Sequence, residues 1–377
     1  MSLDLAAGSP LTATEEARRQ IEICNACRYC EGFCSVFPAM TRDKVFADGD
    51  LTHLANLCHN CRGCYYACQY TAPHEFALNI PAVLGEVRAE SWERLARPQA
   101  LAKLFQEKGV AMAGLLVVAL AAFFWLVAAF RPEAGDGFYA YLAHNLMVAI
   151  FVPAFLGPLV LIGLSLRAYW REVDGGRVRV GHLLKACDMA ARMKNLDGGH
   201  GDGCNFENGD RFTQKRRVYH QLVMWGFVLC FAATSAGTIM HYVFDWPAPY
   251  PIWSLPKLFG VPGGLMMVAG TVGLVVLKLR ADPELGATRV WGGEMAFILL
   301  LGAVAVTGLA LYAATGTAAV APLLAIHLAT VMTLFLLMPF SKMVHGFFRF
   351  TALVAEAGKA IGDDPARPVR LPQGGRF

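Results

Sequence analysis

Six long apolar segments constrain this chain more than any other feature of its sequence. Each is close to the roughly 20 residues that a helix needs to cross a bilayer. Their approximate limits are 109–130, 146–166, 219–244, 259–277, 295–313 and 322–340. Of the 377 residues, 56% are hydrophobic and 16% are charged, whereas soluble domains average about 25% charged residues. We therefore predict an integral membrane protein with six transmembrane helices.

The distribution of lysine and arginine predicts how these helices are oriented, because positive residues concentrate in cytoplasmic loops. Three regions on one side are rich in them, namely the connection between segments two and three, the connection between segments four and five, and the C-terminal tail. They contain Arg167, Arg171, Arg177, Arg179, Lys185, Arg192, Lys194, Arg211, Lys215, Arg216, Arg217, Lys278, Arg280, Arg289, Lys342 and Arg349. The opposite side has little beyond Arg131 and Lys257. We expect both termini to be cytoplasmic, since the first twenty residues also lack the apolar core of a secretory signal.

Eight of the eleven cysteines lie in two short runs with one spacing, C-x2-C-x2-C-x3-C, which bacterial ferredoxins use to bind iron–sulfur clusters. The runs are Cys24, Cys27, Cys30, Cys34 and Cys58, Cys61, Cys64, Cys68. Disulfides are rare in the reducing cytoplasm, and zinc sites usually separate their ligand pairs by about a dozen residues or more. We therefore predict two 4Fe-4S clusters, with two zinc sites as the alternative.

These eight cysteines can be divided between two clusters in two ways. In two-cluster ferredoxins the first three cysteines of a run bind one cluster and the fourth binds the other. This crossed arrangement, which we favour, assigns Cys24, Cys27, Cys30 and Cys68 to cluster 1, and Cys58, Cys61, Cys64 and Cys34 to cluster 2. The alternative keeps each run with its own cluster. The proline that often follows the fourth cysteine is absent, because Ser35 and Gln69 stand there.

Four histidines occupy matched positions on the third segment and around the sixth. His220 and His241 are 21 residues apart, about 31 Å along a helix, and His327 and His345 are 18 apart, about 27 Å. Because the two helices are antiparallel, His220 and His345 share the cytoplasmic end, and His241 and His327 lie toward the outer side. Ionisable residues in membrane helices are usually functional. We predict two haem b groups, ligated by His220/His345 and His241/His327.

The alternative is that these histidines are helix-end residues in contact with lipid headgroups. We interpret a fifth histidine, His144 at the outer end of the second segment, as an interfacial residue or a quinone contact rather than a ligand. In the sequence GGHGDGCN, His200 and Cys204 offer only two metal ligands. We therefore favour a turn-rich loop that docks on the cysteine domain.

Together these features predict an all-α fold, with an N-terminal helical ferredoxin-like domain followed by a six-helix transmembrane bundle. We place the two-cluster domain at residues 1–80, an amphipathic helical link at 81–108 and the haem-b-type membrane domain at 109–345, which includes the cytoplasmic loop 167–217. A cytoplasmic tail spans 346–377. In the link, Trp92 and Phe105 suit the membrane interface. No GxGxxG follows a strand, so the electron donor is expected to be another polypeptide. A net charge of +4 does not indicate nucleic-acid binding.

The chain resembles the tricarballylate/citrate-utilisation protein B family from Cys24 to Arg349. The resemblance lies in the cysteine runs, the GGHGDGCN loop, the segment RRVYHQLVMWGFVLCFAATSAGTIMHY and the closing PFSKMVHGFFRF. The membrane half is more distantly similar to the haem-b gamma subunit of respiratory nitrate reductase, which implies haem ligation by the four histidines named above.

This family resemblance implies an oxidoreductase component of the bacterial inner membrane. It would reoxidise the flavin of a separate FAD-dependent dehydrogenase that acts on tricarballylate or a citrate-type substrate, and would pass electrons to membrane quinone. Three alternatives stay open: a partner for another flavoprotein such as one in cobalamin synthesis, a donor that carries electrons from quinol to the cytoplasm, and a redox-sensing membrane protein.

Overall fold

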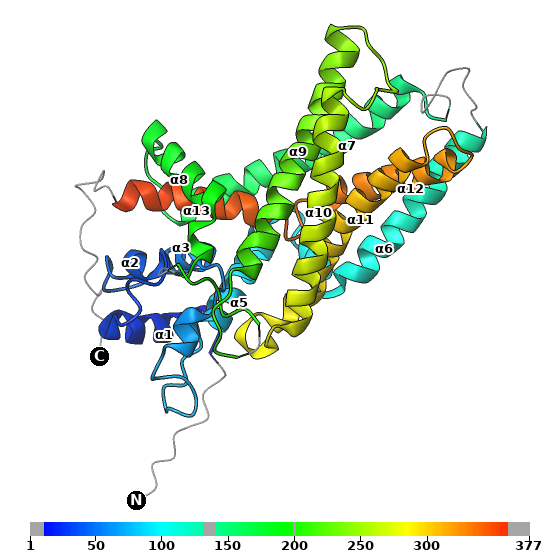
Figure 1. The fold of residues 1–377 in the computed structure, drawn as a ribbon. Helices are drawn as coiled ribbons and strands as arrows, with labels where there is room; N and C mark the ends of the chain where they lie inside the picture. Colours follow the sequence, from blue (N-terminus) through cyan, green and yellow to red (C-terminus); the bar gives the residue numbers. More distant parts are fainter. Residues whose placement is uncertain (1–10, 131–140, 199–200, 208, 361–377) are drawn as a thin grey trace, which may run out of the picture.

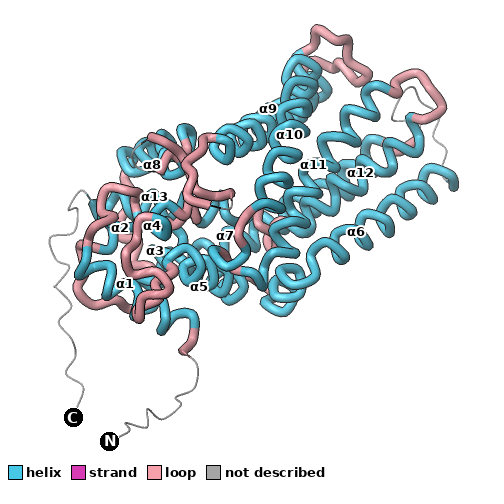
Figure 2. The backbone as a smooth tube through the Cα atoms, turned by 60° about the horizontal axis from the view of Figure 1, so that its bottom comes forward, coloured by secondary structure: helices cyan, strands magenta, loops and turns pink. Residues whose placement is uncertain are grey.

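A computed structural model of the chain describes residues 11–130, 141–198, 201–207 and 209–360. These residues form helices and connecting loops without a β-sheet, which confirms the predicted all-α fold (Figure 2). The helices are α1 (Ala13–Cys27), α2 (Val36–Met40), α3 (Asp48–Leu57), α4 (Gly63–Tyr66), α5 (Ile80–Leu95), α6 (Gln99–Phe130), α7 (His144–Glu172), α8 (Val180–Arg192), α9 (Lys215–Val243), α10 (Leu255–Arg280), α11 (Trp291–Ala313), α12 (Val320–Leu337) and α13 (Val344–Ala360).

Six of the described helices are long and apolar enough to cross a membrane, as the sequence predicts. They are α6, α7, α9, α10, α12 and the stretch Thr288–Ala313 that contains α11. Pro153 and Pro158 lie inside α7, which continues to Glu172. Neighbouring side chains and local adjustments can satisfy the backbone groups that a proline frees in a membrane helix.

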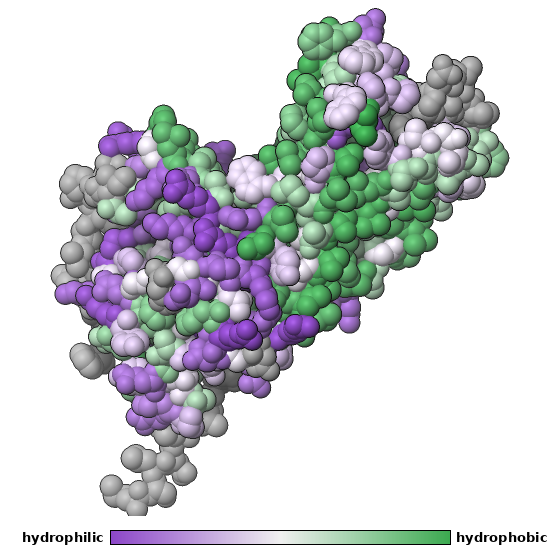
Figure 3. All heavy atoms as spheres, viewed as in Figure 1, coloured by the Kyte–Doolittle hydropathy of each residue, from purple (hydrophilic) through white to green (hydrophobic). Residues whose placement is uncertain are grey.

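The molecule has a polar end and an apolar end. Helices α1–α5 form the cysteine domain at one end, with α8 and α13 beside it, while the long helices extend away from it (Figure 1). On the face that Figure 3 shows, hydrophilic residues predominate on the cysteine domain and hydrophobic residues predominate on the long helices. Among the long helices, α9 pairs closely with α10, while α6 packs against α11 and α12.

The cysteine domain shares its core with the ends of two helices from the membrane half. Ile21 and Leu84 of the cysteine domain belong to one buried cluster with Tyr169 of α7 and Phe348 of α13. Ion pairs reinforce this docking: Arg42 donates to both carboxylate oxygens of Glu356 at 2.7 and 2.6 Å, and Arg94 does the same to Glu172 at 2.8 and 2.6 Å. The domain is therefore held against the bundle along a continuous packed surface.

The expected interfacial role of two aromatic residues in the link is wrong. Trp92 is 7% exposed and Phe105 is fully buried. Trp92 Nε1 donates to Asn56 Oδ1 at 2.9 Å, and its ring lies 6.3 Å from that of Phe348. A sequence pattern marks these residues as apolar, but it does not show that α13 folds back to cover Trp92.

Candidate functional site

Four cysteines from both runs form a first thiol group, comprising Cys24, Cys27, Cys30 and Cys68. They line one cavity of about 230 Å³, which Cys64 also borders. Cys27 is exposed and Tyr29 beside it is 71% exposed, so the first thiol group reaches the surface of the molecule. The fourth cysteine of the second run therefore lies with the first three of the first run.

The second thiol group comprises Cys34, Cys58, Cys61 and Cys64, which line a smaller cavity of about 20 Å³. Cys58 and Cys61 are buried. The backbone between them turns sharply, and Asn60 and Arg62 adopt left-handed conformations at φ 52° and 69°. Asparagine tolerates this region better than most residues. The turn directs the N–H of Asn60 at Cys58 Sγ, 3.4 Å away.

Several thiols of both groups lie near one another and are largely shielded from water. Burial, followed by the charges of Cys68 and neighbouring cysteines, raises the pKa of Cys24 and Cys30 to about 12. Burial and the nearby cysteines also raise the pKa of Cys34 and Cys64 well above the usual thiol range. A thiolate is the form that binds metal, and binding deprotonates a coordinating thiol outright. This donor set fits two four-thiolate sites.

The described residues contain no group of three His, Cys, Asp or Glu side chains close enough to hold a single metal ion. A tetrahedral zinc ion binds sulfur at about 2.3 Å, which brings its thiolates within roughly 4 Å of each other. A four-iron cluster binds one thiolate at each of four separate irons, so its ligands surround a wider space than the ligands of a single zinc ion.

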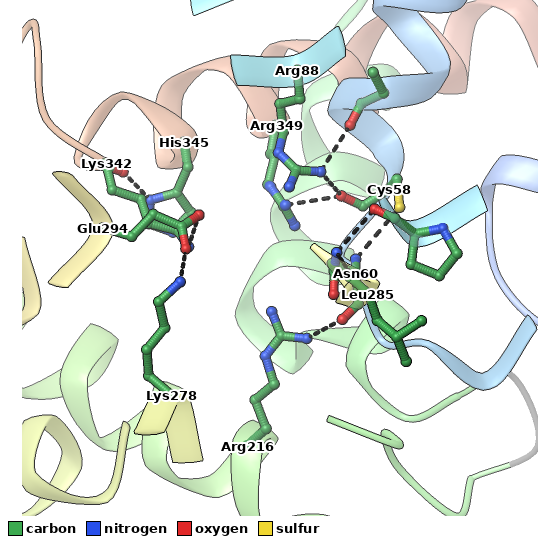
Figure 4. Close-up of polar contacts among 12 residues, drawn as sticks. Cys58, Asn60, Arg88, Arg216, Lys278, Leu285, Glu294, Lys342, His345 and Arg349 are labelled. Carbon is green, nitrogen blue, oxygen red and sulfur yellow. Dashed lines mark hydrogen bonds and ion pairs between the residues drawn. The ribbon is translucent and has the colours of Figure 1, made fainter. Parts of the chain in front are cut away.

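Arginines from three helices clamp the backbone of the second thiol group (Figure 4). Arg88 of α5 and Arg349 of α13 both donate to the carbonyl oxygen of Cys58, at 2.9 and 2.8 Å. Arg216 of α9 donates to the carbonyl oxygen of Asn60 at 2.7 Å. We call Arg88, Arg216 and Arg349 the arginine clamp. It fixes the Cys58 loop against α5, α9 and α13 and places three positive charges around it.

The glycine-rich loop also contacts the second thiol group, as the docking interpretation predicts. The N–H of Asn205 donates to the carbonyl oxygen of Cys61 at 2.9 Å. The buried Cys204 packs against Cys61, and its thiol donates to the carbonyl oxygen of Leu196 at 3.2 Å. Gly203 has φ +105°, and an added Cβ would lie 2.2 Å from Thr213 O, so this turn requires glycine. His200 lies outside the described residues.

The structure brings His220 and His345 together at the end of the bundle that meets the cysteine domain. Their ring centroids are 5.7 Å apart. His345 Nδ1 donates a hydrogen bond to the carbonyl oxygen of Lys342, which leaves Nε2 available to accept. Metal-ligating histidines commonly donate their other N–H in this way, because the bond fixes the tautomer and the ring orientation. This pair therefore fits the chemistry of axial haem ligation.

The other predicted pair is not in contact among the described residues. His241 instead stacks on His144 of α7, with ring centroids 4.1 Å apart. His327 faces α11, where its Nδ1 shares a hydrogen bond of 3.0 Å with Thr307 Oγ1. An added Cβ at Gly308 would lie 3.0 Å from His327 Cε1, so the two helices approach closely at this ring.

A buried ion triad lies near His345 (Figure 4). Glu294 of α11 pairs with Lys278 of α10 and, at 2.7 Å, with Lys342. The triad joins two membrane helices to the turn that precedes α13. In the sequence, both lysines, Arg216 and Arg349 indicate only the topology of the helices. The spacing of the two arginines indicates more, because Arg216 precedes His220 by four residues and Arg349 follows His345 by four. Each arginine therefore shares a helix face with a histidine.

Comparisons with known proteins agree over most of the chain. The family model described as "Citrate utilization protein B" matches residues 97–366, and the one described as "Citrate utilization protein B Fer4-like domain" matches residues 17–93. A curated relative from Escherichia coli named "Citrate utilization protein B" is 43% identical over 345 residues, which cover 90% of each chain. No solved structure matches.

Proposed function

Because this chain belongs to the citrate utilization protein B family, we propose that it is a membrane-bound electron-transfer protein that reoxidises the reduced flavin of a partner dehydrogenase. The partner acts on tricarballylate or a citrate-type tricarboxylate and is a separate FAD-dependent polypeptide. Two 4Fe-4S clusters, held by the first and second thiol groups, supply single-electron redox chemistry. Haem b in the membrane half and membrane quinone complete the route. The protein then lies in the bacterial inner membrane with its cysteine domain and both termini cytoplasmic.

The observation that carries this proposal is the shared placement of arginines and histidines on α9 and α13. On α9, Arg216 contacts the second thiol group's loop and His220 follows four residues later. On α13, His345 precedes Arg349, which contacts the same loop, by four residues. Residues at this spacing lie on one helix face, about 5–6 Å apart. The facing histidines thus stand about one helical turn from the second thiol group.

The first thiol group supports a docking role for the outer face of the cysteine domain. Cys27 is exposed, and Tyr70, His74 and Phe76 form a cluster of rings nearby, with centroids 4.8–5.6 Å apart. Cys68 accepts a hydrogen bond from the N–H of Tyr70 at 3.3 Å. A flavoprotein that docks on this face brings its flavin next to the first thiol group, with the second behind it.

The test compares flavin reoxidation by the Cys61→Ala and Cys187→Ala variants in the purified membrane protein. Cys187 is an exposed cysteine outside both thiol groups and serves as the matched control. With a reduced partner flavoprotein and a soluble quinone analogue, Cys61→Ala stops flavin reoxidation, whereas Cys187→Ala supports it at the wild-type rate. After the haem iron is subtracted, iron and acid-labile sulfide measurements show about eight of each in the wild type.

Several outcomes would contradict the proposal. An unchanged rate of flavin reoxidation by Cys61→Ala would show that electrons do not pass through the second thiol group. Zinc in place of iron and sulfide would favour the structural-metal alternative. Intact clusters without any quinone reduction would favour a redox sensor.

A further inference from the structure

Helix α8 has two apolar faces, and only one of them is covered. His182 and Ala186 are buried on the face that packs against α13, where an added Cβ at Gly358 would lie 3.2 Å from His182 Cε1. Val180 and Leu184 are each two residues from His182, which places them roughly on the opposite side of the helix. They are 70% and 67% exposed. The face of α8 that points away from α13 is therefore apolar and open.

The open apolar surface extends beyond these two residues. Val178 lies in the loop that precedes α8 and is also exposed, as is Leu183 at the edge of the same helix face. We call Val178, Val180, Leu183 and Leu184 the α8 face. Figure 3 shows hydrophobic residues gathered over this helix, apart from those of the long helices. Contiguous exposed apolar patches mark sites that interact with proteins or membranes.

Both ends of α8 are joined to helices that are long and apolar enough to cross a membrane. Residues 173–179 connect the end of α7 at Glu172 to the start of α8. At the other end, Arg217 in the first turn of α9 donates to the carbonyl oxygen of Arg192, the last residue of α8, at 3.1 and 2.8 Å. These connections hold α8 beside the points where α7 and α9 leave the bilayer.

The charges around α8 are those that an anionic membrane surface attracts. Arg167 and Arg171 are exposed and lie four residues apart near the end of α7, so they share one helix face. Across residues 167–194, exposed lysines and arginines outnumber the exposed acids, which are Asp174 and Asp188. Asp188 is already paired with Arg192 at 2.7 Å. Basic residues next to an amphipathic helix favour a position in the membrane interface, where anionic headgroups attract them.

The position of α8 separates it from the proposed flavoprotein face. In Figure 1 and Figure 2, α13 lies between α8 and α1, and the exposed Cys27 is the last residue of α1. A flavoprotein bound at Cys27 would be on the other side of α13. Membrane lipid, by contrast, surrounds the two helices to which α8 is joined.

We propose that the α8 face lies in the membrane surface on the side of the cysteine domain. Its apolar side chains contact lipid acyl chains, and Arg167 and Arg171 bind the phosphates of anionic phospholipids. This inference goes beyond the proposed electron route and depends on none of its cofactors. Because α8 packs against α13, the lipid contact also supports the helix whose Arg349 bonds to the Cys58 loop.

The test uses the full chain in nanodiscs of phosphatidylcholine, with and without phosphatidylglycerol. Phosphatidylcholine that carries a diazirine in its acyl chain crosslinks to the peptide containing Leu184, as mapped by mass spectrometry. Phosphatidylglycerol slows hydrogen exchange of the α8 amides, by about fivefold for each arginine that meets a headgroup. The double variant Arg167→Gln/Arg171→Gln loses this difference. Lys44→Gln keeps it, since Lys44 is exposed on the cysteine domain.

A second pair of variants tests the apolar contact. Leu184→Gln places an amide among acyl chains, so its α8 amides exchange faster than those of the wild type in both kinds of nanodisc. Leu11→Gln changes an exposed leucine of the cysteine domain and leaves exchange in α8 unchanged. Iron and sulfide content equal to the wild type shows that each variant has folded.

Absence of a crosslink at α8, or equal exchange in the two kinds of nanodisc, would overturn the proposal. Protection of α8 that appears only with the partner flavoprotein would also overturn it and make the α8 face a protein-binding surface. Protection that rises with protein concentration in detergent would replace lipid with a second copy of the chain. None of these results bears on flavin reoxidation, so the electron route stands or fails separately.

Discussion

Arg349→Gln should lower the reduction potential of the cluster proposed at the second thiol group. Arg349 donates to the carbonyl oxygen of Cys58 at 2.8 Å, and Arg88 donates to the same oxygen at 2.9 Å. Glutamine removes the charge, while Arg88 still satisfies the carbonyl group. Reduction adds a negative charge to a cluster, so loss of a nearby positive charge makes reduction less favourable. The other cluster lies farther from Arg349 and should shift less.

The magnitude follows from Coulomb's law. With roughly 7 Å between the guanidinium and the cluster, and an effective dielectric constant of about 20, the interaction energy is about 2 kcal/mol. For a one-electron couple, 1.4 kcal/mol corresponds to about 59 mV. Arg349→Gln should therefore lower the second cluster's potential by about 100 mV. Arg349→Lys keeps the charge and should shift it much less.

The assay is a redox titration of the purified protein followed by electron paramagnetic resonance, with iron and sulfide measured for each variant. Arg177→Gln is the matched control, since Arg177 is exposed and lies outside the arginine clamp. Unchanged potentials in Arg349→Gln with full cluster occupancy would refute the electrostatic reasoning. Equal shifts in both clusters would refute the placement of Arg349 beside one of them.

Three further changes test the packing and electrostatics of the cysteine domain. Gly49→Val places a Cβ 2.1 Å from the backbone oxygen of Glu172, so it should destabilise the protein by about 1–3 kcal/mol in thermal unfolding; Gly32→Ala, with no atom within 4 Å of the new Cβ, should be near neutral. Burial raises the pKa of Glu356, but hydrogen bonds from its histidine and arginine partners outweigh burial and lower it overall. Its contribution is therefore present above the ordinary glutamate range and is lost as pH falls through the lowered pKa. Glu356→Gln should cost about 2 kcal/mol at pH 7, and this difference from wild type should vanish in acid. Cys204→Ala should keep all cluster iron, because this thiol lies outside both thiol groups; loss of iron would make it a ligand.

The all-α fold and its six membrane helices could be predicted because hydropathy alone imposes them. Matched depth places His220 beside His345, as the structure has them, but it does not predict that His241 meets His144, since helical spacing gives the depth of a residue but not the neighbour that its face meets. His241 has the depth of both His144 and His327, and only packing distinguishes them. Trp92 illustrates the same limit, because its cover comes from α13, more than two hundred residues later in the chain.

Charged residues were the least predictable part of the site. In a membrane protein, an arginine in a loop already has an explanation as a marker of the cytoplasmic side. The sequence alone therefore gives no reason to assign it a further role. Arg216 and Arg349 carry a second function in the structure, since each bonds to a carbonyl oxygen of the Cys58 loop. Arg88 is not among the residues that predict the topology, and its role depends on the way α5 packs against α3.

The position of the arginine clamp bears on the direction of electron flow. In the proposal, the first thiol group is exposed at Cys27 and lies farther from the arginine clamp, whereas the second is buried beside three guanidinium groups. Positive charge and hydrogen bonds raise cluster potentials, so the second cluster should have the higher potential. Electrons then move from the exposed cluster toward the membrane, as flavin reoxidation requires. A second cluster with the lower potential would reverse this gradient and favour transfer from quinol to a cytoplasmic acceptor.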